Sequence, residues 1–260
     1  MPKKNLDTFK SEHPYCCFCG GSAATETRDE VPPKTLFFKR DWPEGYQFPA
    51  CMNCNQSSRL VDQALGLIGR MSIADVHSEE ESLLPHVKGV ANNSPHLLPR
   101  TSKSAIEAKK TLRELGIRKP TGMFAQDVPI ALLPAEAMSE LDTFFAKLFC
   151  ALYYKHIGKV VPNQSNVLIN RTTNQILDSD NPFDWQMIPG VTNRSVIKRS
   201  GRSLHDQFDY NWFFDPDEQA FGFNFHIRYS LFGLMVGPVT AEVAADFPSD
   251  AKLKTGRPSA

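Results

Sequence analysis

The clearest pattern of apolar positions in the chain is helical and spans residues 135–157. Apolar side chains recur there at intervals of three and four, which places them on one face of a helix. They are Leu141, Phe144, Phe145, Leu148, Phe149 and Leu152. Gly158 follows this segment, and glycine readily ends a helix in the left-handed conformation. We therefore predict a helix over 135–157 whose apolar face forms the centre of the larger core.

The C-terminal third of the chain follows a two-residue period instead. Between residues 221 and 227 apolar side chains alternate with small and polar ones, which is typical of a strand with one apolar face. Residues 208–214 and 231–236 predict two further strands, so we expect an antiparallel sheet. His226 and Arg228 alternate with the apolar face, and we expect both on the exposed face of this sheet.

Weaker patterns predict the remaining elements. Short strands are expected over 25–31, 128–133 and 167–170, and a charged helix over 101–115. Another helix begins at the second cysteine pair, with apolar residues at helical spacing as far as Ile68. Together these segments predict a fold of the α+β class.

The same patterns divide the chain into four regions. We expect a zinc-binding module over 13–70 and an α+β domain over 101–248 that contains the antiparallel sheet. Proline and asparagine residues favour a linker or long loop over 71–100. The polar residues 249–260 are expected to form a flexible tail.

Composition narrows the class of protein. The 260 residues are 41% hydrophobic and 10% aromatic, as in a folded globular protein. Lys plus Arg and Asp plus Glu both number 29, so the chain has no overall basic field, and any nucleic-acid binding must use a local patch. No apolar run approaches the roughly 20 residues of a membrane span, and the first residues lack the apolar core of a signal peptide.

Four of the six cysteines form two Cys-x-x-Cys pairs. The pairs are Cys16 with Cys19 and Cys51 with Cys54. Two such pairs supply the four thiolates of a tetrahedral structural zinc site. Cys16 is preferred to Cys17 as a ligand because only Cys16 leaves two residues before Cys19. Cys17 and Cys150 are left as reduced thiols, and this cysteine usage points to the cytoplasm.

The order of motifs around these cysteines resembles a zinc-bearing branch of the HNH, or His-Me-finger, endonucleases. The residues that carry the resemblance are Cys16-x-x-Cys19, then Thr27-Arg28-Asp29-Glu30-Val31-Pro32-Pro33-Lys34, then Pro49-Ala50-Cys51-x-x-Cys54-Asn55. It is strong over 14–65 and looser beyond. The resemblance implies a treble-clef-like ββα module, in which a two-stranded ribbon and a helix surround the active site.

The resemblance also implies a catalytic slot. The position of Glu30 normally holds the histidine that activates water, and Asp29 lies beside it. Asn55 resembles the asparagine that orients the base, and Asp62 matches an acidic residue that helps to hold a divalent ion. The expected reaction is hydrolysis of phosphodiester bonds with Mg²⁺ or Mn²⁺. Glu30 would act as base or metal ligand, although an ordinary glutamate is a weaker base than histidine.

Two groups of basic residues are candidates for phosphate contacts. One group lies near the zinc motif and comprises Lys34, Lys39, Arg40 and Arg59. The other comprises Arg194, Lys198, Arg199 and Arg202. We expect nucleic acid as the partner, DNA more than RNA, although such basic residues also occur on purely solvated faces.

Two alternatives to a nuclease remain open. Glu30 in place of histidine, with Gln63 where an acid is often found, favours a catalytically degenerate module that binds nucleic acid or protein. The neutral net charge also permits a zinc-stabilised interaction protein with no role in nucleic-acid binding. In either case the C-terminal sheet offers a surface for self-association or a protein partner.

Overall fold

A six-stranded antiparallel sheet is the largest element of this protein in the computed structural model. The structure describes residues 5–69, 80–101, 104–114, 124, 131–173, 193–228 and 231–256. The strands are β5 (Asn166–Thr173), β6 (Asn193–Arg194), β9 (Phe208–Asp215), β10 (Ala220–Ile227), β11 (Leu231–Val239) and β12 (Lys252–Lys254). Their order across the sheet is β12-β5-β11-β10-β9-β6. The structure thus confirms a mixed helix and sheet fold with a C-terminal antiparallel sheet.

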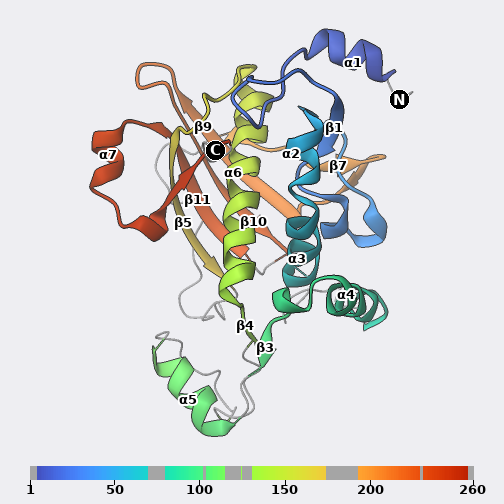
Figure 1. Ribbon diagram of the computed structural model, residues 1–260, viewed down its shortest axis with the longest axis vertical. Coiled ribbons are helices and arrows are strands. Elements are labelled where there is room, and N and C mark those ends of the chain that lie inside the picture. Colours follow the sequence, from blue (N-terminus) through green and yellow to red (C-terminus); the bar gives the residue numbers. More distant parts are fainter. Residues whose placement is uncertain are drawn as a thin grey trace.

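Helix α6 (Ala135–Ile157) crosses one face of this sheet (Figure 1). Its aromatic side chains pack directly on β10. The ring centroids of Phe145 and Phe225 lie 5.2 Å apart, and those of Phe149 and Phe221 lie 5.9 Å apart. The predicted helix and its role at the centre of the core are both confirmed.

Both faces of β10 are covered, contrary to the expectation from its alternating pattern. Arg228, just beyond the strand, is 0% exposed. Its guanidinium donates to the carbonyl oxygens of Gly69 at 3.2 Å and Leu36 at 3.3 Å. His226 is partly buried against the carbonyl of His205, and burial lowers the pKa of His226. The predicted exposure was wrong because Leu36 and Gly69 cover Arg228 and the loop at His205 covers His226.

The cysteine-containing part is a hairpin followed by helices. Its elements are β1 (Thr27–Glu30), β2 (Gln47–Ala50), α2 (Met52–Gln56) and α3 (Arg59–Gly69), with 3₁₀ turns at Lys34–Leu36 and Phe38–Arg40. β1 and β2 are antiparallel, and α3 packs against α6. The buried cysteines and the aromatic residues of the sheet belong to one continuous core.

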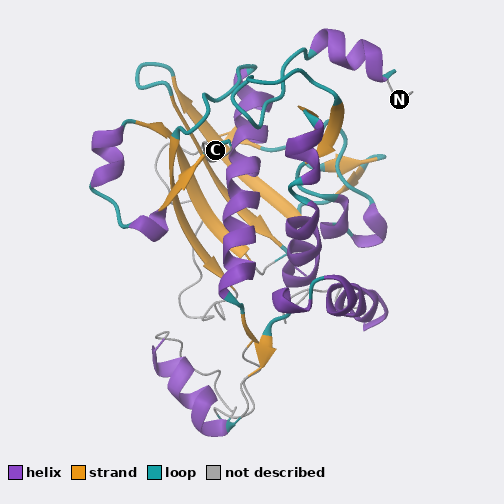
Figure 2. Cartoon of the chain, in the orientation of Figure 1, coloured by secondary structure: helices purple, strands orange, loops and turns teal. Residues whose placement is uncertain are grey.

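The smaller elements surround this arrangement (Figure 2). They are α1 (Leu6–Glu12), α4 (Glu80–Asn93), α5 (Ala105–Glu114), α7 (Ala241–Ala245), the strand pair β3 (Arg100–Thr101) and β4 (Ala131–Leu132), the strand pair β7 (Lys198–Arg199) and β8 (Arg202–Ser203), and 3₁₀ turns at Pro95–Leu97 and Ser249–Ala251. Within the described ranges, no helix combines the length and apolar character that crossing a bilayer requires.

Two segments expected to be irregular contain regular structure. The predicted linker over 71–100 includes α4, which accommodates Pro85 in its interior and buries Val90; residues 70–79 lie outside the described part. The predicted flexible tail includes β12, which pairs with β5 and places Leu253 and Thr255 in buried positions. Both predictions relied on local polarity and proline content, which do not reveal a neighbouring surface.

The packing of α6 on the sheet gives a direct test. We expect Phe149→Ala to lower the free energy of unfolding by about 3–5 kcal/mol, because it leaves a cavity at a fully buried site. The matched control Phe247→Ala removes the same atoms from a side chain that is 42% exposed, and should cost about 1 kcal/mol or less. Chemical denaturation followed by circular dichroism measures both, and equal losses would contradict the central position of Phe149.

Candidate metal centre

Four cysteine thiols converge where the first loop meets the start of α2. The Sγ atoms of Cys16, Cys19, Cys51 and Cys54 all lie within 4.8 Å of one another, and all four residues are buried. A tetrahedral site with zinc–sulfur bonds of about 2.3 Å separates its sulfurs by about 3.8 Å. The donor set and its spacing therefore fit a metal ion such as zinc. Cys17 is buried but is not part of the cluster, as predicted.

Backbone N–H groups donate hydrogen bonds to two of these sulfurs and so stabilise their thiolate forms. The N–H of Phe18 donates to Sγ of Cys16 at 3.4 Å, and the N–H of Cys54 donates to Sγ of Cys51 at 3.5 Å. Gly20 turns the first loop with a φ of 66°, and a β-carbon there would lie 2.4 Å from a backbone nitrogen of the facing loop. Only glycine fits this position without displacing the loop.

The electrostatics of the cluster also favour a cation. A hydrogen bond from Cys54 lowers the pKa of Cys16 to about 5, against the effect of burial. The same hydrogen bond, together with burial, raises the pKa of Cys54. Thiolates this close repel one another, so all four can ionise together only if a positive ion compensates their charge.

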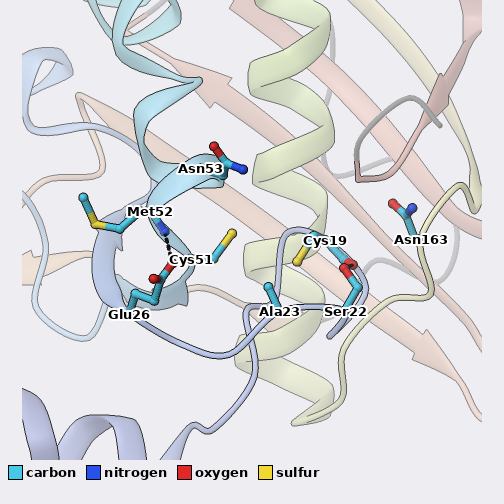
Figure 3. A pocket seen from close by; sticks show the side chains of 8 residues that line it. All are labelled: Cys19, Ser22, Ala23, Glu26, Cys51, Met52, Asn53 and Asn163. Atoms are coloured by element: carbon cyan, nitrogen blue, oxygen red, sulfur yellow. Dashed lines mark hydrogen bonds between the residues drawn. The ribbon is translucent and has the colours of Figure 1, made fainter. Parts of the chain in front are cut away.

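A pocket of about 350 Å³ opens beside the thiol cluster (Figure 3). Cys19 and Cys51 face each other across it, and Glu26 accepts a hydrogen bond of 2.7 Å from the backbone N–H of Met52. That bond satisfies one of the free N–H groups at the start of α2. Cys19 and Cys51 line this pocket although both are buried.

Two of the residues expected in the catalytic slot have structural partners on β1 and β2. The side-chain amide of Asn55 donates to the carbonyl of Arg28 at 3.2 Å and so ties α2 to β1. The carboxylate of Glu30 pairs with Nζ of Lys34 at 2.6 Å and accepts a hydrogen bond of 3.1 Å from Gln47. These contacts orient the end of β1, and the catalytic roles of Glu30 and Asn55 stay predictions.

Asp29 is buried and holds a lysine from a distant helix. It is 6% exposed, and its Oδ2 lies 2.5 Å from Nζ of Lys147 on α6. The same ammonium donates to Oγ of Ser58 at 2.7 Å and to the carbonyl of Cys54 at 3.4 Å. These three acceptors match the three N–H groups of a lysine ammonium. Burial raises the pKa of Asp29, and the charge of Lys147 opposes that shift.

Asp62 completes an acidic group around this lysine. Burial raises the pKa of Asp62 to about 7, Lys147 lowers it, and Asp29 and Glu30 raise it further. The three carboxyl groups therefore lie close enough to influence one another. Among the residues that the structure describes, however, the thiol cluster is the only group of three or more His, Cys, Asp or Glu side chains placed to hold a metal ion.

Lys147 is the residue that sequence reasoning missed. It lies 118 positions from Asp29, and its neighbours Phe144 and Leu148 belong to the buried face of α6. A lysine beside an apolar face usually extends into solvent. The only signal in the sequence was its place at the edge of that face, and only the packing of α6 against the cysteine module brings it to Asp29.

The basic residues near the zinc motif have different surroundings. Lys34 pairs with Glu30, and its Nζ lies 4.1 Å from the ring centroid of Trp42. Lys39 and Arg40 are exposed. Arg59 begins α3, but its side chain lies outside the described residues. Contact between these residues and nucleic acid stays a prediction.

The metal centre predicts different outcomes for adjacent cysteines. We expect the purified protein to bind about one zinc ion, and Cys16→Ala to lose most of it, because three thiolates leave the tetrahedral set incomplete. Cys17→Ala, the neighbouring control, should retain the metal. Elemental analysis and thermal melting with and without a chelator measure both effects. Equal zinc loss in the two variants would exclude the four-thiol assignment.

The raised pKa of Asp62 predicts a pH dependence of stability. Its folded pKa of about 7 lies above the ordinary value of 3.8, so the protonated group stabilises the fold at low pH, and this contribution is lost as pH rises through 7. Between about pH 5.5 and 8.5 the wild type should lose about 2 kcal/mol of stability relative to Asp62→Asn. Denaturant titrations of both zinc-loaded proteins at the two pH values measure it. Parallel pH profiles would contradict the shift.

Comparison of the chain with protein-family models, with curated proteins and with solved structures finds no match. The assignment of a function therefore rests on the residues and geometry described above.

Proposed function

We propose that this chain is a zinc-stabilised module of HNH-like ββα architecture that binds nucleic acid and does not hydrolyse it. The order of its elements supports the HNH-like interpretation. The thiol cluster lies at the two ends of the β1–β2 hairpin, and α2 and α3 follow the second cysteine pair. This is the order that a treble-clef-like HNH module requires.

The observation that carries the proposal is the ion pair between Asp29 and Lys147. A divalent ion such as Mg²⁺ needs free carboxylate oxygens and near-octahedral coordination. The Asp29 carboxylate is buried and already neutralised by the ammonium at 2.5 Å. A metal ion at this carboxylate would compete with Lys147, and displacing the lysine would leave a buried cation without its partner, which is strongly unfavourable.

Two cavities lie near the cysteine module, and neither coincides with the expected catalytic slot. Besides the pocket at the thiols, a cavity of about 670 Å³ lies beside α6 and β12 and is lined in part by Lys147. Neither cavity is lined by Asp29, Glu30, Asn55 or Asp62, all of which belong to the described part of the chain. A phosphodiester in either cavity would therefore not touch the expected catalytic side chains.

A metal-dependent nuclease is the second candidate, and Asp62 is the observation that favours it. No described side chain donates a hydrogen bond to its carboxylate, so its oxygens could take a divalent cation. In this case Asp29 and Asp62 would hold Mg²⁺ or Mn²⁺, which would stabilise charge on the phosphoryl group, and Lys147 would have to withdraw.

Binding and cleavage assays separate the two candidates. We expect the zinc-loaded protein to bind duplex DNA, single-stranded DNA or RNA with an affinity that falls steeply with salt, because phosphate contacts release counterions. We expect no cleavage with Mg²⁺ or Mn²⁺, because the ammonium of Lys147 is already paired with the carboxylate of Asp29. Gel electrophoresis of supercoiled plasmid and of labelled single strands provides the measurement.

The outcomes are distinct. Cleavage that disappears in EDTA and in Asp62→Ala would overturn the binding-module proposal in favour of the nuclease, and Glu30→His should then increase the rate. Neither binding nor cleavage by a folded, zinc-loaded sample would contradict both candidates and would point to a protein partner.

A further inference from the structure

Two basic segments that are far apart in the sequence meet on the surface of the protein. One is the loop over 34–44 between β1 and β2, and the other is the hairpin β7–β8. The guanidinium of Arg199 donates to the carbonyl of Trp42 at 3.0 Å, and that of Arg202 donates to the carboxylate of Asp41 at 2.9 Å. These pairs are 157 and 161 positions apart in the chain, so no local pattern predicts their contact.

Backbone contacts fix the hairpin to the loop. The N–H of Glu44 donates to the carbonyl of Lys198 at 3.0 Å, and the carboxylate of Glu44 accepts from the N–H of Ser200 at 3.0 Å. Ser200 and Gly201 connect the two strands with φ angles of 46° and 79°, as in a tight two-residue hairpin turn. The basic side chains of β7 and β8 are therefore presented from a backbone with a defined position.

Trp42 gathers cations from both segments. Nζ of Lys34 lies 4.1 Å from its ring centroid, and the guanidinium carbon of Arg199 lies 4.2 Å from the same centroid. An aromatic face attracts a cation, so the ring keeps both charges at this junction. Each of these two cations also has a carboxylate partner, Glu30 for Lys34 and Asp41 for Arg199.

The charges at this junction are unequal. Six basic residues belong to the two segments, namely Lys34, Lys39, Arg40, Lys198, Arg199 and Arg202, and we call them the composite basic surface. Three acidic residues contact the two segments. Glu30 pairs with Lys34, Asp41 pairs with Arg202, and Glu44 accepts a hydrogen bond from the N–H of Ser200. Four of the six basic residues are exposed. The excess of positive charge is local, because the whole chain has no net charge.

We propose that the composite basic surface binds the phosphate backbone of nucleic acid, with the β7–β8 hairpin and the 34–44 loop contacting phosphates together. This inference rests on the proposed nucleic-acid binding and adds the hairpin, which lies outside the HNH-like module, as half of the binding surface. Arginine and lysine side chains on two linked segments suit a ligand with regularly repeated negative charges. Contacts of this type position the nucleic acid and carry no sequence preference of their own.

Matched double substitutions test the surface. One variant combines Lys198→Gln with Arg202→Gln in the hairpin, and another combines Lys39→Gln with Arg40→Gln in the loop. The control combines Lys109→Gln with Arg113→Gln on α5, which removes the same charge from exposed positions far from β7 in Figure 1. Fluorescence anisotropy measures the dissociation constants for duplex DNA, single-stranded DNA and RNA of one sequence between about 50 and 200 mM salt.

If the hairpin and the loop act together, each of these two variants binds more weakly, and the slope of log K against log salt falls by about 2 for duplex DNA, whereas the control keeps the wild-type slope. Comparison of the three ligands shows which nucleic acid the surface prefers. A hairpin variant that binds like the control, while the loop variant binds more weakly, would overturn the composite surface and leave the proposed function standing. A wild type that binds polyglutamate but no nucleic acid would overturn the proposed function and, with it, this assignment.

Discussion

The packing of α6 on two partners at once holds this protein together. One side of the helix places Phe145 and Phe149 against the aromatic residues of β10. Another side of the helix packs against α3, and Lys147 on that side pairs with Asp29 of the cysteine module. Because both contacts belong to one rigid helix, the position of the sheet fixes the position of the thiol cluster. The continuous core that contains both parts follows from this arrangement.

Buried cations connect the cysteine module to the rest of the chain. Lys147 pairs with Asp29 on β1, and Arg228 donates to the carbonyl of Gly69, the last residue of α3. A cation at a helix C-terminus is favoured by the free carbonyl groups there. Burying a charge is costly unless partners compensate for it, so such contacts tolerate few alternative arrangements of the surrounding groups. The contacts of Lys147 and Arg228 therefore define the position of the cysteine module relative to α6 and the sheet.

The site combines a cluster of four thiols with a neighbouring group of acidic residues, Asp29, Glu30 and Asp62. The thiols are buried, close together and supported by backbone N–H groups, which is the character of a structural zinc site. Beside them, the ammonium of Lys147 pairs with the buried carboxylate of Asp29. We propose that this ion pair keeps a divalent ion away from Asp29, and the composite basic surface near Trp42 is compatible with the proposed binding of nucleic acid.

The sequence by itself determined the elements whose signals are local. Period and capping identified α6 and its end at Gly158, where φ is 73°. Alternation identified β10, and the apolar segments before and after it predicted β9 and β11. The two-residue gap in Cys-x-x-Cys selected Cys16 over Cys17, because ligand spacing is a property of consecutive residues. Only the tertiary structure decided the rest. Four contacts depend on surfaces supplied by distant segments. They are the burial of Arg228, the pairing of β12 with β5, the ion pair of Lys147 with Asp29 and the contact of Arg199 with Trp42. No local pattern encodes such contacts, since each side chain carries the same sequence signal whether solvent or another segment covers it.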